Sequence, residues 1–114
     1  MVAANSKVYG LIGLAAKAGV IITGSDVCER AIAEGKAKLV VIAEDSSENT
    51  KEKFMRIAFS GGVEVRLFGT CEALGHYSGK ENRAVAVICD RGFAEKLTAT
   101  IDASACKNGG GLIG

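Results

Sequence analysis

Apolar residues recur at helical spacing in five segments of the chain, and four short apolar or alternating runs lie between these segments. A recurrence every three to four residues is typical of an amphipathic helix, whereas a short continuous or alternating run is typical of a strand. The pattern predicts strands at residues 20–22, 38–43, 63–68 and 84–89, with a helix before, between and after them. Helices and strands are therefore expected to alternate along the chain.

Capping residues and glycines mark the predicted helix ends, because the chain contains 15 glycines and no proline. Serine, threonine and aspartate accept hydrogen bonds from the free N–H groups of a first helical turn, and glycine ends a helix in the left-handed conformation. The expected N-caps are Asn5 or Ser6, Ser25, one of Asp45, Ser46 and Ser47, Thr70, and Asp90. The expected stops are Gly19, Gly35, and Gly61 with Gly62, and the last helix is expected to reach about Ile101.

This order of elements predicts an α/β fold, a three-layer α-β-α sandwich with helices on both faces of a small sheet of about four strands. Residues 38–43 and 84–89 are almost continuously apolar, which is typical of strands covered on both faces. The order of the strands in the sheet stays open. A length of 114 residues suits one domain. We assign residues 1–103 to this domain and residues 104–114, which include three consecutive glycines, to a flexible C-terminal tail.

Composition and charge narrow the possible functions. Hydrophobic residues make up 48% of the chain and charged residues 24%, as in a soluble globular domain. The apolar runs are far shorter than a membrane span and the N-terminal residues lack the pattern of a secretory signal, so we expect a cytoplasmic protein with no membrane partner. The net charge is only +1 at pH 7, so any contact with nucleic acid is expected to be local.

The cysteines and the single histidine form no metal-binding or catalytic pattern. Cys28, Cys71, Cys89 and Cys106 are scattered singly, a spacing that suits neither a zinc site nor a disulfide framework. Cys28 and Cys89 fall on apolar faces and are expected to be buried. Cys71 at a helix start can have a lowered thiol pKa, although a structural role is favoured. His76 is expected on a helix surface, and we expect no metal, cofactor, small-molecule substrate or enzymatic activity.

Two further motifs carry little functional signal. The glycines do not indicate a nucleotide-binding loop, because Gly10 and Gly13 lie inside the first predicted helix and the tail glycines at residues 109–114 follow no predicted strand. The adjacent carboxylates Glu44 and Asp45 end a strand, where metal or acid–base chemistry is one interpretation and helix capping with solvation is the other. Capping is favoured, because adjacent side chains on a strand point apart and no third ligand is placed by the spacing.

The helix start at Gly24 is suited to bind an anion. Backbone N–H groups in the first turn have no intrahelical partner and lie at the positive end of the helix dipole, so a phosphate can bind where side chains leave room. Glycine leaves that room, and Arg30 adds positive charge. Six cations bracket this helix start and the polar loop at residues 79–83, namely Lys17, Arg30, Lys36, Lys38, Lys80 and Arg83.

Several segments together carry a family resemblance. Residues 24–35 read GSDVCERAIAEG, residues 38–45 read KLVVIAED, residues 71–75 read CEALG, and Gly79 precedes Lys80. In these segments the chain resembles the L7Ae family of ribosomal-type proteins that bind kink-turn RNA. The resemblance runs from about residue 9 to residue 101 and is closest to the small bacterial members. It implies an α-β-α sandwich around a mixed sheet, no catalytic activity, and RNA binding at the helix start and at the loop before the last strand.

The family motif at this helix start reads Gly-x-Asn-Glu-x-x-Lys and reaches the guanine–adenine pairs of the kink. Gly24 matches the glycine, Asp26 stands at the asparagine position, Val27 at the glutamate position and Arg30 at the lysine position. Arginine keeps the charge and adds a bidentate geometry that suits guanine or phosphate. An ionised Asp26 only accepts hydrogen bonds, and Val27 neither donates nor accepts. The departures weaken kink-turn specificity more than RNA binding.

The second predicted contact is the polar loop at residues 79–83. Lys80 and Arg83 are suited to phosphate and Asn82 to a base edge, as in recognition of splayed RNA, whereas the alternative interpretation is a solvated turn. The predicted RNA-binding residues are Gly24, Ser25, Asp26, Arg30, Lys36, Lys80, Glu81, Asn82 and Arg83.

We therefore predict a non-catalytic RNA-binding protein, expected to associate with the ribosome, that docks a bent or kink-turn RNA. The alternative is a protein-interaction module that has kept the fold and lost RNA recognition. A thiol- or metal-dependent enzyme ranks last, because no residue spacing supports it.

Overall fold

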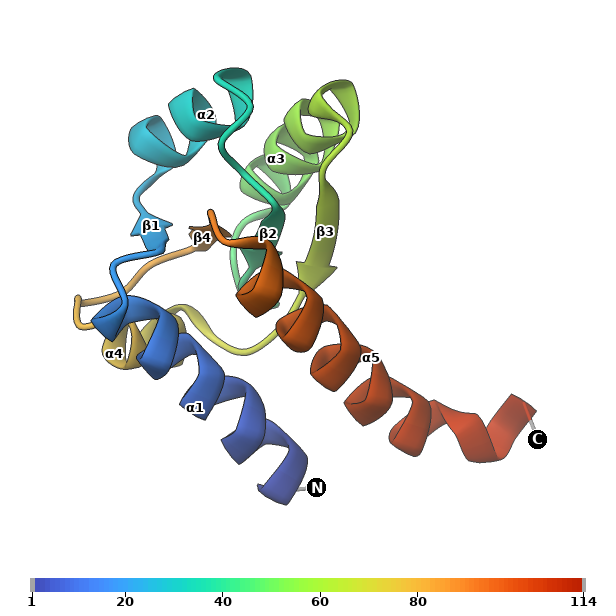
Figure 1. Ribbon diagram of the computed structural model, residues 1–114. Coiled ribbons are helices and arrows are strands. Elements are labelled where there is room, and N and C mark those ends of the chain that lie inside the picture. Colours follow the sequence, from blue (N-terminus) through green and yellow to red (C-terminus); the bar gives the residue numbers. More distant parts are fainter. Residues whose placement is uncertain (1, 114) are drawn as a thin grey trace.

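The computed structural model describes the backbone of residues 2–113 and the side chains of residues 6–104. Within these limits helices and strands alternate as predicted (Figure 1). The elements are α1 (Val2–Lys17), β1 (Ile21–Thr23), α2 (Ser25–Ala33), β2 (Leu39–Ile42), α3 (Glu48–Gly61), β3 (Glu64–Leu67), α4 (Cys71–Tyr77), β4 (Val85–Ile88) and α5 (Arg91–Ile113).

The strands form one mixed sheet in the order β1-β4-β2-β3. β4 runs antiparallel to both β1 and β2, whereas β2 and β3 are parallel. The register pairs Thr23 with Ala86, and Ile42 with both Val85 and Leu67. The C-terminal ends of β1, β2 and β3 and the N-terminal end of β4 therefore meet at one border of the sheet, which we call the carboxyl border. The opposite border is the amino border.

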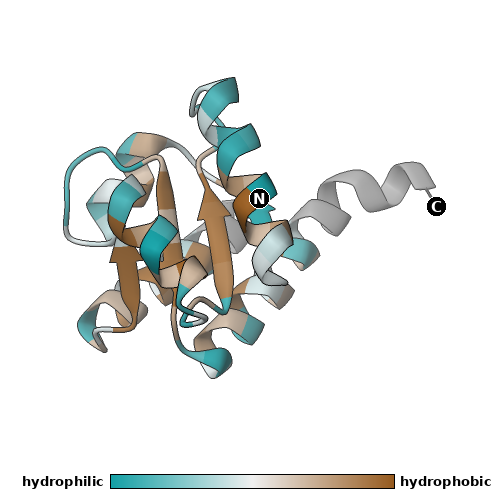
Figure 2. Cartoon of the chain, turned by 90° about the horizontal axis from the view of Figure 1, so that it is seen from above, coloured by the Kyte–Doolittle hydropathy of each residue, from teal (hydrophilic) through white to brown (hydrophobic). Residues whose placement is uncertain are grey.

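Helices cover both faces of the sheet, which confirms the three-layer sandwich. In Figure 1, α2 and α3 lie above the sheet and α1, α4 and α5 below it. Val40 and Val87 belong to the core beneath α2 and α3, whereas Val41 and Ala86 belong to the core with α1, α4 and α5. Figure 2 shows the hydrophobic strands in the middle of the molecule. The central strands read as continuous apolar runs because side chains on both of their faces are buried.

Three predicted N-caps are confirmed. Ser47 Oγ accepts a hydrogen bond from the N–H of Thr50 (3.1 Å) and caps α3, which ends at Gly62 in the left-handed conformation. Thr70 caps α4, and Asp90 Oδ2 accepts from the N–H of Phe93 at the start of α5. Each capping side chain is close in sequence to the N–H group that it accepts from, so these caps can be predicted without the tertiary structure.

The predicted stops at Gly19 and Gly35 are also confirmed, since both glycines have positive φ (74° and 77°) just after α1 and α2. Two helix starts and the end of the last helix differ from the structure. α1 begins at Val2, so neither Asn5 nor Ser6 precedes it as an N-cap. The N-cap of α2 is Gly24, and Ser25 is already helical and forms no capping hydrogen bond. α5 continues to Ile113, beyond the expected domain end at residue 103 and through the three consecutive glycines at residues 109–111. The division into a domain at 1–103 and a flexible tail at 104–114 stays a prediction.

No helix among the described residues is long and apolar enough to cross a membrane.

Candidate functional site

The start of α2 is open at the carboxyl border. Gly24 has φ 101° and ψ 134°, a conformation that favours glycine, and a Cβ placed there would meet no atom within 4 Å. Among the described side chains none caps this helix, and Ser25, Asp26 and Val27 in its first turn are exposed. The first N–H groups of α2 are therefore open to an acceptor from outside the protein.

The loop at residues 79–83 is held against α4 by backbone hydrogen bonds. The N–H of Lys80 donates to the carbonyl oxygen of Gly75 (2.7 Å), and the N–H of Arg83 donates to that of Cys71 (3.0 Å). The loop approaches α4 so closely that a Cβ on Gly75 would lie 2.5 Å from the carbonyl carbon and oxygen of Glu81. Glycine at this helical position thus fixes the path of the loop.

Arg83 joins this loop to the segment that leads into α2. Its Nε donates to Thr23 Oγ1 (3.3 Å), and Thr23 immediately precedes Gly24. Its Nη1 donates to the carbonyl oxygens of Glu81 (3.1 Å) and Asn82 (3.0 Å). The antiparallel pairing of β1 with β4 makes this contact possible, because it places the end of β1 beside the start of β4. Two segments whose contacting residues are 60 positions apart thereby form one surface.

The structure brings the loop at residues 79–83 beside the segment that leads into α2, whereas Arg30 lies in the last turn of that helix. Arg30 on α2 and the loop residues Lys80, Glu81 and Asn82 are exposed. Arg83 is partly buried, and three of its hydrogen bonds serve the fold, so its main role is to position the loop.

Lys36 does not lie on this surface. It follows the opposite end of α2, a helix about 13 Å long at 1.5 Å per residue, and it pairs with Glu34 at 3.2 Å. Lys38 also lies at the amino border, where its N–H donates to the carbonyl oxygen of Ile88. We therefore leave Lys36 out of the candidate site, because proximity in sequence to α2 does not bring it near the first turn.

One of the two carboxylates after β2, Asp45, caps a helix. Asp45 Oδ1 accepts from the N–H of Cys71 at the start of α4 (2.8 Å), and this hydrogen bond lowers the pKa of Asp45. The described side chains contain no cluster of three metal-ligating residues. Asp45 thus caps a different helix from the one that follows it in sequence, since α4 also begins at the carboxyl border.

The cysteine environments correct one prediction. Burial, together with the hydrogen bond to Asp45, raises the pKa of Cys71, which is the opposite of the lowered value that its helix-start position allowed. Cys28 is fully buried and its pKa is raised by burial to about 12, as expected for a structural thiol. Cys89 is partly buried and packs beside the core under α2 and α3, and His76 is exposed, as predicted. Cys106 lies outside the described side chains.

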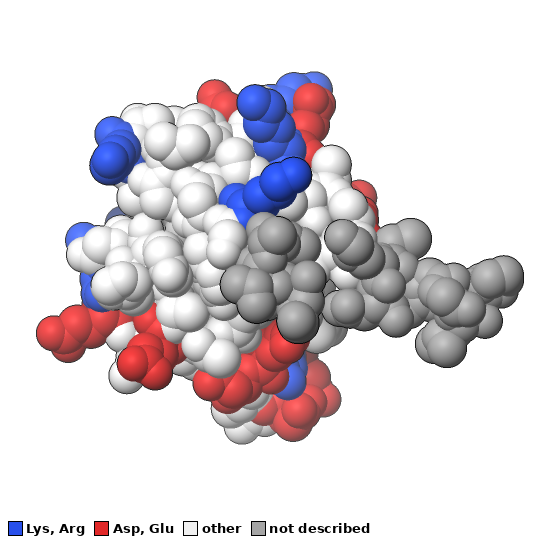
Figure 3. Space-filling model, turned by 90° about the horizontal axis from the view of Figure 1, so that it is seen from below, with Lys and Arg blue, Asp and Glu red and all other residues white. Residues whose placement is uncertain are grey.

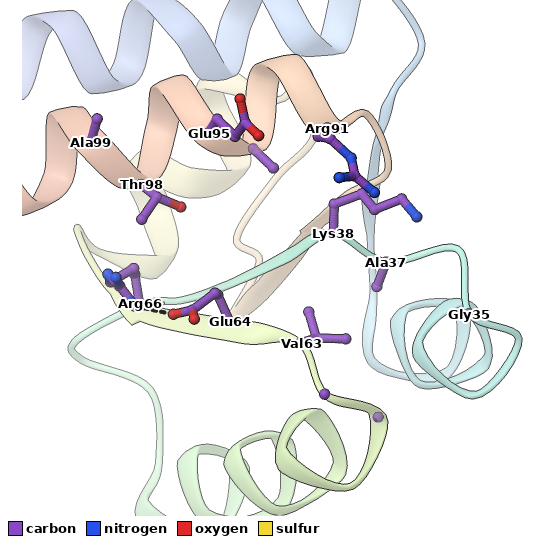
Figure 4. Close-up of a pocket in the computed structure, with 13 residues that line it drawn as sticks. Gly35, Ala37, Lys38, Val63, Glu64, Arg66, Arg91, Glu95, Thr98 and Ala99 are labelled. Carbon is purple, nitrogen blue, oxygen red and sulfur yellow. Dashed lines mark hydrogen bonds and ion pairs between the residues drawn. The ribbon is translucent and has the colours of Figure 1, made fainter.

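A pocket of about 660 Å³ lies at the amino border, away from the start of α2 (Figure 4). Lys38 and Arg91 lie side by side at one end of it. Arg66 at the other end is engaged by Glu64 (2.9 Å) and by both oxygens of Asp102 (2.7 and 3.0 Å). None of the predicted RNA-binding residues lines this pocket, so it is separate from the candidate site.

The charged side chains are unevenly distributed over the face of the molecule that α1, α4 and α5 form. Figure 3 views the molecule from the side on which α1, α4 and α5 lie in Figure 1, and its middle is largely uncharged, with acidic side chains along the lower border. The described part of this face therefore offers no extended basic surface for nucleic acid. This agrees with the net charge of +1 and with a small, local site.

Sequence reasoning missed Thr23, which joins the loop to the segment before α2, and Gly75, which lets the loop pack against α4. A signal for Gly75 was available, because a glycine inside a helix is unfavourable and often marks a close approach of another backbone. Thr23 carried no such signal, since only the strand pairing reveals its contact with Arg83.

Comparisons with known proteins agree with this architecture. A family model described as the ribosomal protein L7Ae/L30e/S12e/Gadd45 family matches residues 6–98. The chain is 35% identical to the RNA-binding protein YlxQ of Bacillus subtilis over 94 residues, and this alignment covers 82% of this chain and 94% of that protein. It is 36% identical to the RNA-binding protein YlxQ of Enterococcus faecium over 99 residues, and this alignment covers 86% of this chain and 94% of that protein.

Solved structures show the same fold. A protein of unknown function from Bacillus halodurans superposes with a TM-score of 0.81 at 35% identity, over 84% of this chain and 97% of that one. The 15.5kD RNA binding protein of Giardia lamblia superposes with a TM-score of 0.72 at 22% identity, over 88% of each chain. The second likeness concerns the fold alone.

Proposed function

The chain belongs to the ribosomal protein L7Ae/L30e/S12e/Gadd45 family, and we propose that it is a non-catalytic protein that binds a bent or kink-turn RNA. The RNA contacts one surface, which we call the α2–loop surface. Its members are Gly24, Ser25, Asp26, Arg30, Lys80, Glu81, Asn82 and Arg83. One observation carries the proposal: the Arg83–Thr23 hydrogen bond places the polar loop beside the open start of α2.

Each part of the α2–loop surface suits a different part of an RNA. The free N–H groups after Gly24 bind a backbone phosphate, and the helix dipole favours the negative charge. Arg30 forms two parallel hydrogen bonds to a guanine edge or a phosphate. Asp26 accepts a hydrogen bond from a base amino group, and Asn82 reads a base edge that a bulge or kink exposes. Val27, 47% exposed, contributes an apolar contact to an unstacked base.

The proposed partner is an RNA of the ribosome, in keeping with the ribosomal proteins that give the family its name. An internal kink in a structured RNA presents splayed bases and closely spaced phosphates, which a small surface can recognise despite a net charge of only +1. Sucrose-gradient sedimentation of a cell extract tests this partner. The chain is expected to migrate with ribosomal particles and to leave them after RNase treatment.

Titration of a labelled kink-turn RNA tests the surface itself, with a straightened RNA of the same length as the control. Arg30→Ala is expected to weaken binding to the kinked RNA by about 1–3 kcal/mol, because a bidentate base contact is lost. Lys36→Ala removes the same charge at the far end of α2 and is expected to leave the affinity within about twofold.

Two results would contradict the proposal. Equal, weak and steeply salt-dependent binding to both RNAs would leave only non-specific electrostatics. Equal losses in the two variants would show that charge rather than position matters. In either case, protein partners that survive nuclease treatment of the extract would favour the alternative, a protein-interaction module.

A further inference from the structure

β3 forms a free edge of the sheet and is flanked by exposed apolar side chains. It pairs with β2 on one side, and no other described strand pairs with it. Phe59 on the adjacent α3 is 86% exposed, Met55 41% and Leu67 37%. With Val63 and Val65 they line a groove of about 370 Å³. An aromatic side chain this exposed beside an unpaired strand is typical of an interaction surface.

The hydrogen-bonding groups of this edge are also available. The N–H of Phe68 donates to the carbonyl oxygen of Ile42 (2.9 Å), so Phe68 faces β2. Backbone groups alternate in direction along a strand, so Glu64 and Arg66 face β2 as well and Val65 and Leu67 face outward. Among the described residues no backbone group outside the sheet pairs with them, and one side-chain donor does: Arg66 Nη1 donates to the carbonyl oxygen of Val65 (2.9 Å). They can bind another strand.

We propose that two copies of the chain form a symmetric dimer by antiparallel pairing of their β3 strands, centred on Val65. In this register the outward-facing backbone groups of Val65 bond to those of Val65 in the second copy, whose N–H replaces Arg66 Nη1 as the donor to the Val65 carbonyl oxygen. Glu64 then lies directly opposite Arg66 of the second copy, and the two-fold axis repeats this ion pair, which replaces the Glu64–Arg66 pair within each chain (2.9 Å).

Charge selects this register over its neighbours. A shift of two residues in one direction keeps the same face but places Arg66 opposite Arg66 of the second copy. A shift of two residues in the other direction places Glu64 opposite Glu64. Like charges directly opposite each other destabilise a strand pair, so β3 is complementary to itself in one register.

The apolar face of β3 matches in the same register. Val63 lies opposite Leu67 of the second copy, and Val65 opposite Val65. Phe59 and Met55 on α3 flank this row. The apolar grooves of the two copies therefore face each other, and their side chains are removed from water in the dimer. β3 and β1 are opposite edges of the sheet, so the α2–loop surface next to β1 stays accessible in the dimer. Such a dimer would present two RNA-binding surfaces.

Sedimentation equilibrium of the purified full chain without RNA tests the dimer, from about 1 µM to about 1 mM. The wild type is expected to be a dimer at the upper end and to dissociate on dilution. Phe59→Ser is expected to weaken dimerisation at least tenfold without unfolding the chain, because Phe59 is 86% exposed. Leu14→Ser is the matched control: Leu14 is 54% exposed on α1, and this change is expected to leave dimerisation unaltered.

Charge exchange tests the register. Glu64→Arg and Arg66→Glu are each expected to dimerise at least tenfold more weakly, because each homodimer pairs like charges. A mixture of the two is expected to form a heterodimer, in which both cross-strand pairs are opposite in charge. Thermal unfolding checks that both variants fold, since Arg66 also binds Asp102. If Arg66→Glu unfolds the chain, the dimer affinities of Glu64→Arg and Glu64→Gln are compared instead. Both variants remove the negative charge, but only the arginine adds repulsion against Arg66 of the second copy, so Glu64→Arg is expected to dimerise more weakly.

A wild type that stays monomeric to about 1 mM overturns the proposal, as does a dimer that Phe59→Ser and Glu64→Arg leave unchanged. Because no RNA is present, these outcomes are independent of whether the α2–loop surface binds RNA.

Discussion

Gly75 is the position where the path of the loop at residues 79–83, which we propose to bind RNA, can be perturbed most directly. An alanine Cβ there would lie 2.5 Å from the carbonyl carbon and oxygen of Glu81 and 2.8 Å from the nitrogen of Asn82, whereas ordinary contact begins at 3.4 Å. The obstacles are backbone atoms, so the loop has to retreat by roughly 0.9 Å. This retreat strains the hydrogen bond from the N–H of Lys80 to the carbonyl oxygen of Gly75 (2.7 Å).

The expected cost of Gly75→Ala follows from two opposing effects. Overpacking in a close-packed region destabilises by about 1–3 kcal/mol. Alanine in a helix interior gains about 1 kcal/mol over glycine, so the net loss in unfolding free energy is about 0–2 kcal/mol. Gly10→Ala isolates the second effect, because a Cβ at Gly10 in α1 meets no atom within 4 Å. That control is expected to stabilise the chain by about 0.5–1 kcal/mol.

Urea unfolding of both variants and titration of the kink-turn RNA provide the measurement. Gly75→Ala is expected to lie about 1–3 kcal/mol below Gly10→Ala in stability and to bind the RNA at least tenfold more weakly, because its displaced loop no longer fits. If the two variants are equally stable and bind RNA like the wild type, the close approach of loop and helix has no role in positioning the site.

Three further predictions concern the carboxyl border and the core. The hydrogen bond from Cys71 lowers the pKa of Asp45, so its contribution to stability is present above the unfolded-state pKa and is lost as the pH falls through the folded-state pKa. Asp45→Asn is therefore expected to destabilise the chain at pH 7 and not at pH 2, by urea unfolding; a loss that is equal at both pH values would refute this. Cys28, with a pKa of about 12 instead of 9.0, is expected to react with a thiol reagent about a thousandfold more slowly in the folded chain than after unfolding, by mass spectrometry of the labelled peptides. Fast labelling of Cys28 in the folded chain would contradict its burial. Gly24→Ala is expected to lower the unfolding free energy by about 1–3 kcal/mol, because φ is 101° there; an unchanged urea midpoint would show that this strain is absent.

The sequence by itself determined the order of the elements and most helix ends after the second strand. Ser47, Thr70 and Asp90 bind N–H groups only three residues away, so local chemistry suffices to find them. The continuous apolar runs of the central strands likewise indicate burial on both faces, because successive side chains point to opposite faces of the sheet and both faces are covered by helices. The family resemblance predicted the mixed sheet and the position of the proposed RNA-binding site.

Only the tertiary structure decided which of these segments meet. Strand order depends on pairing across the whole chain, and it is this order that places Thr23 beside Arg83 and separates Lys36 from Gly24. The same holds for Cys71, whose pKa is raised by burial and by Asp45 although its position at a helix start suggested the opposite. Contacts between distant residues depend on packing, and a sequence pattern with a period of two or 3.6 residues records only which face of an element is buried.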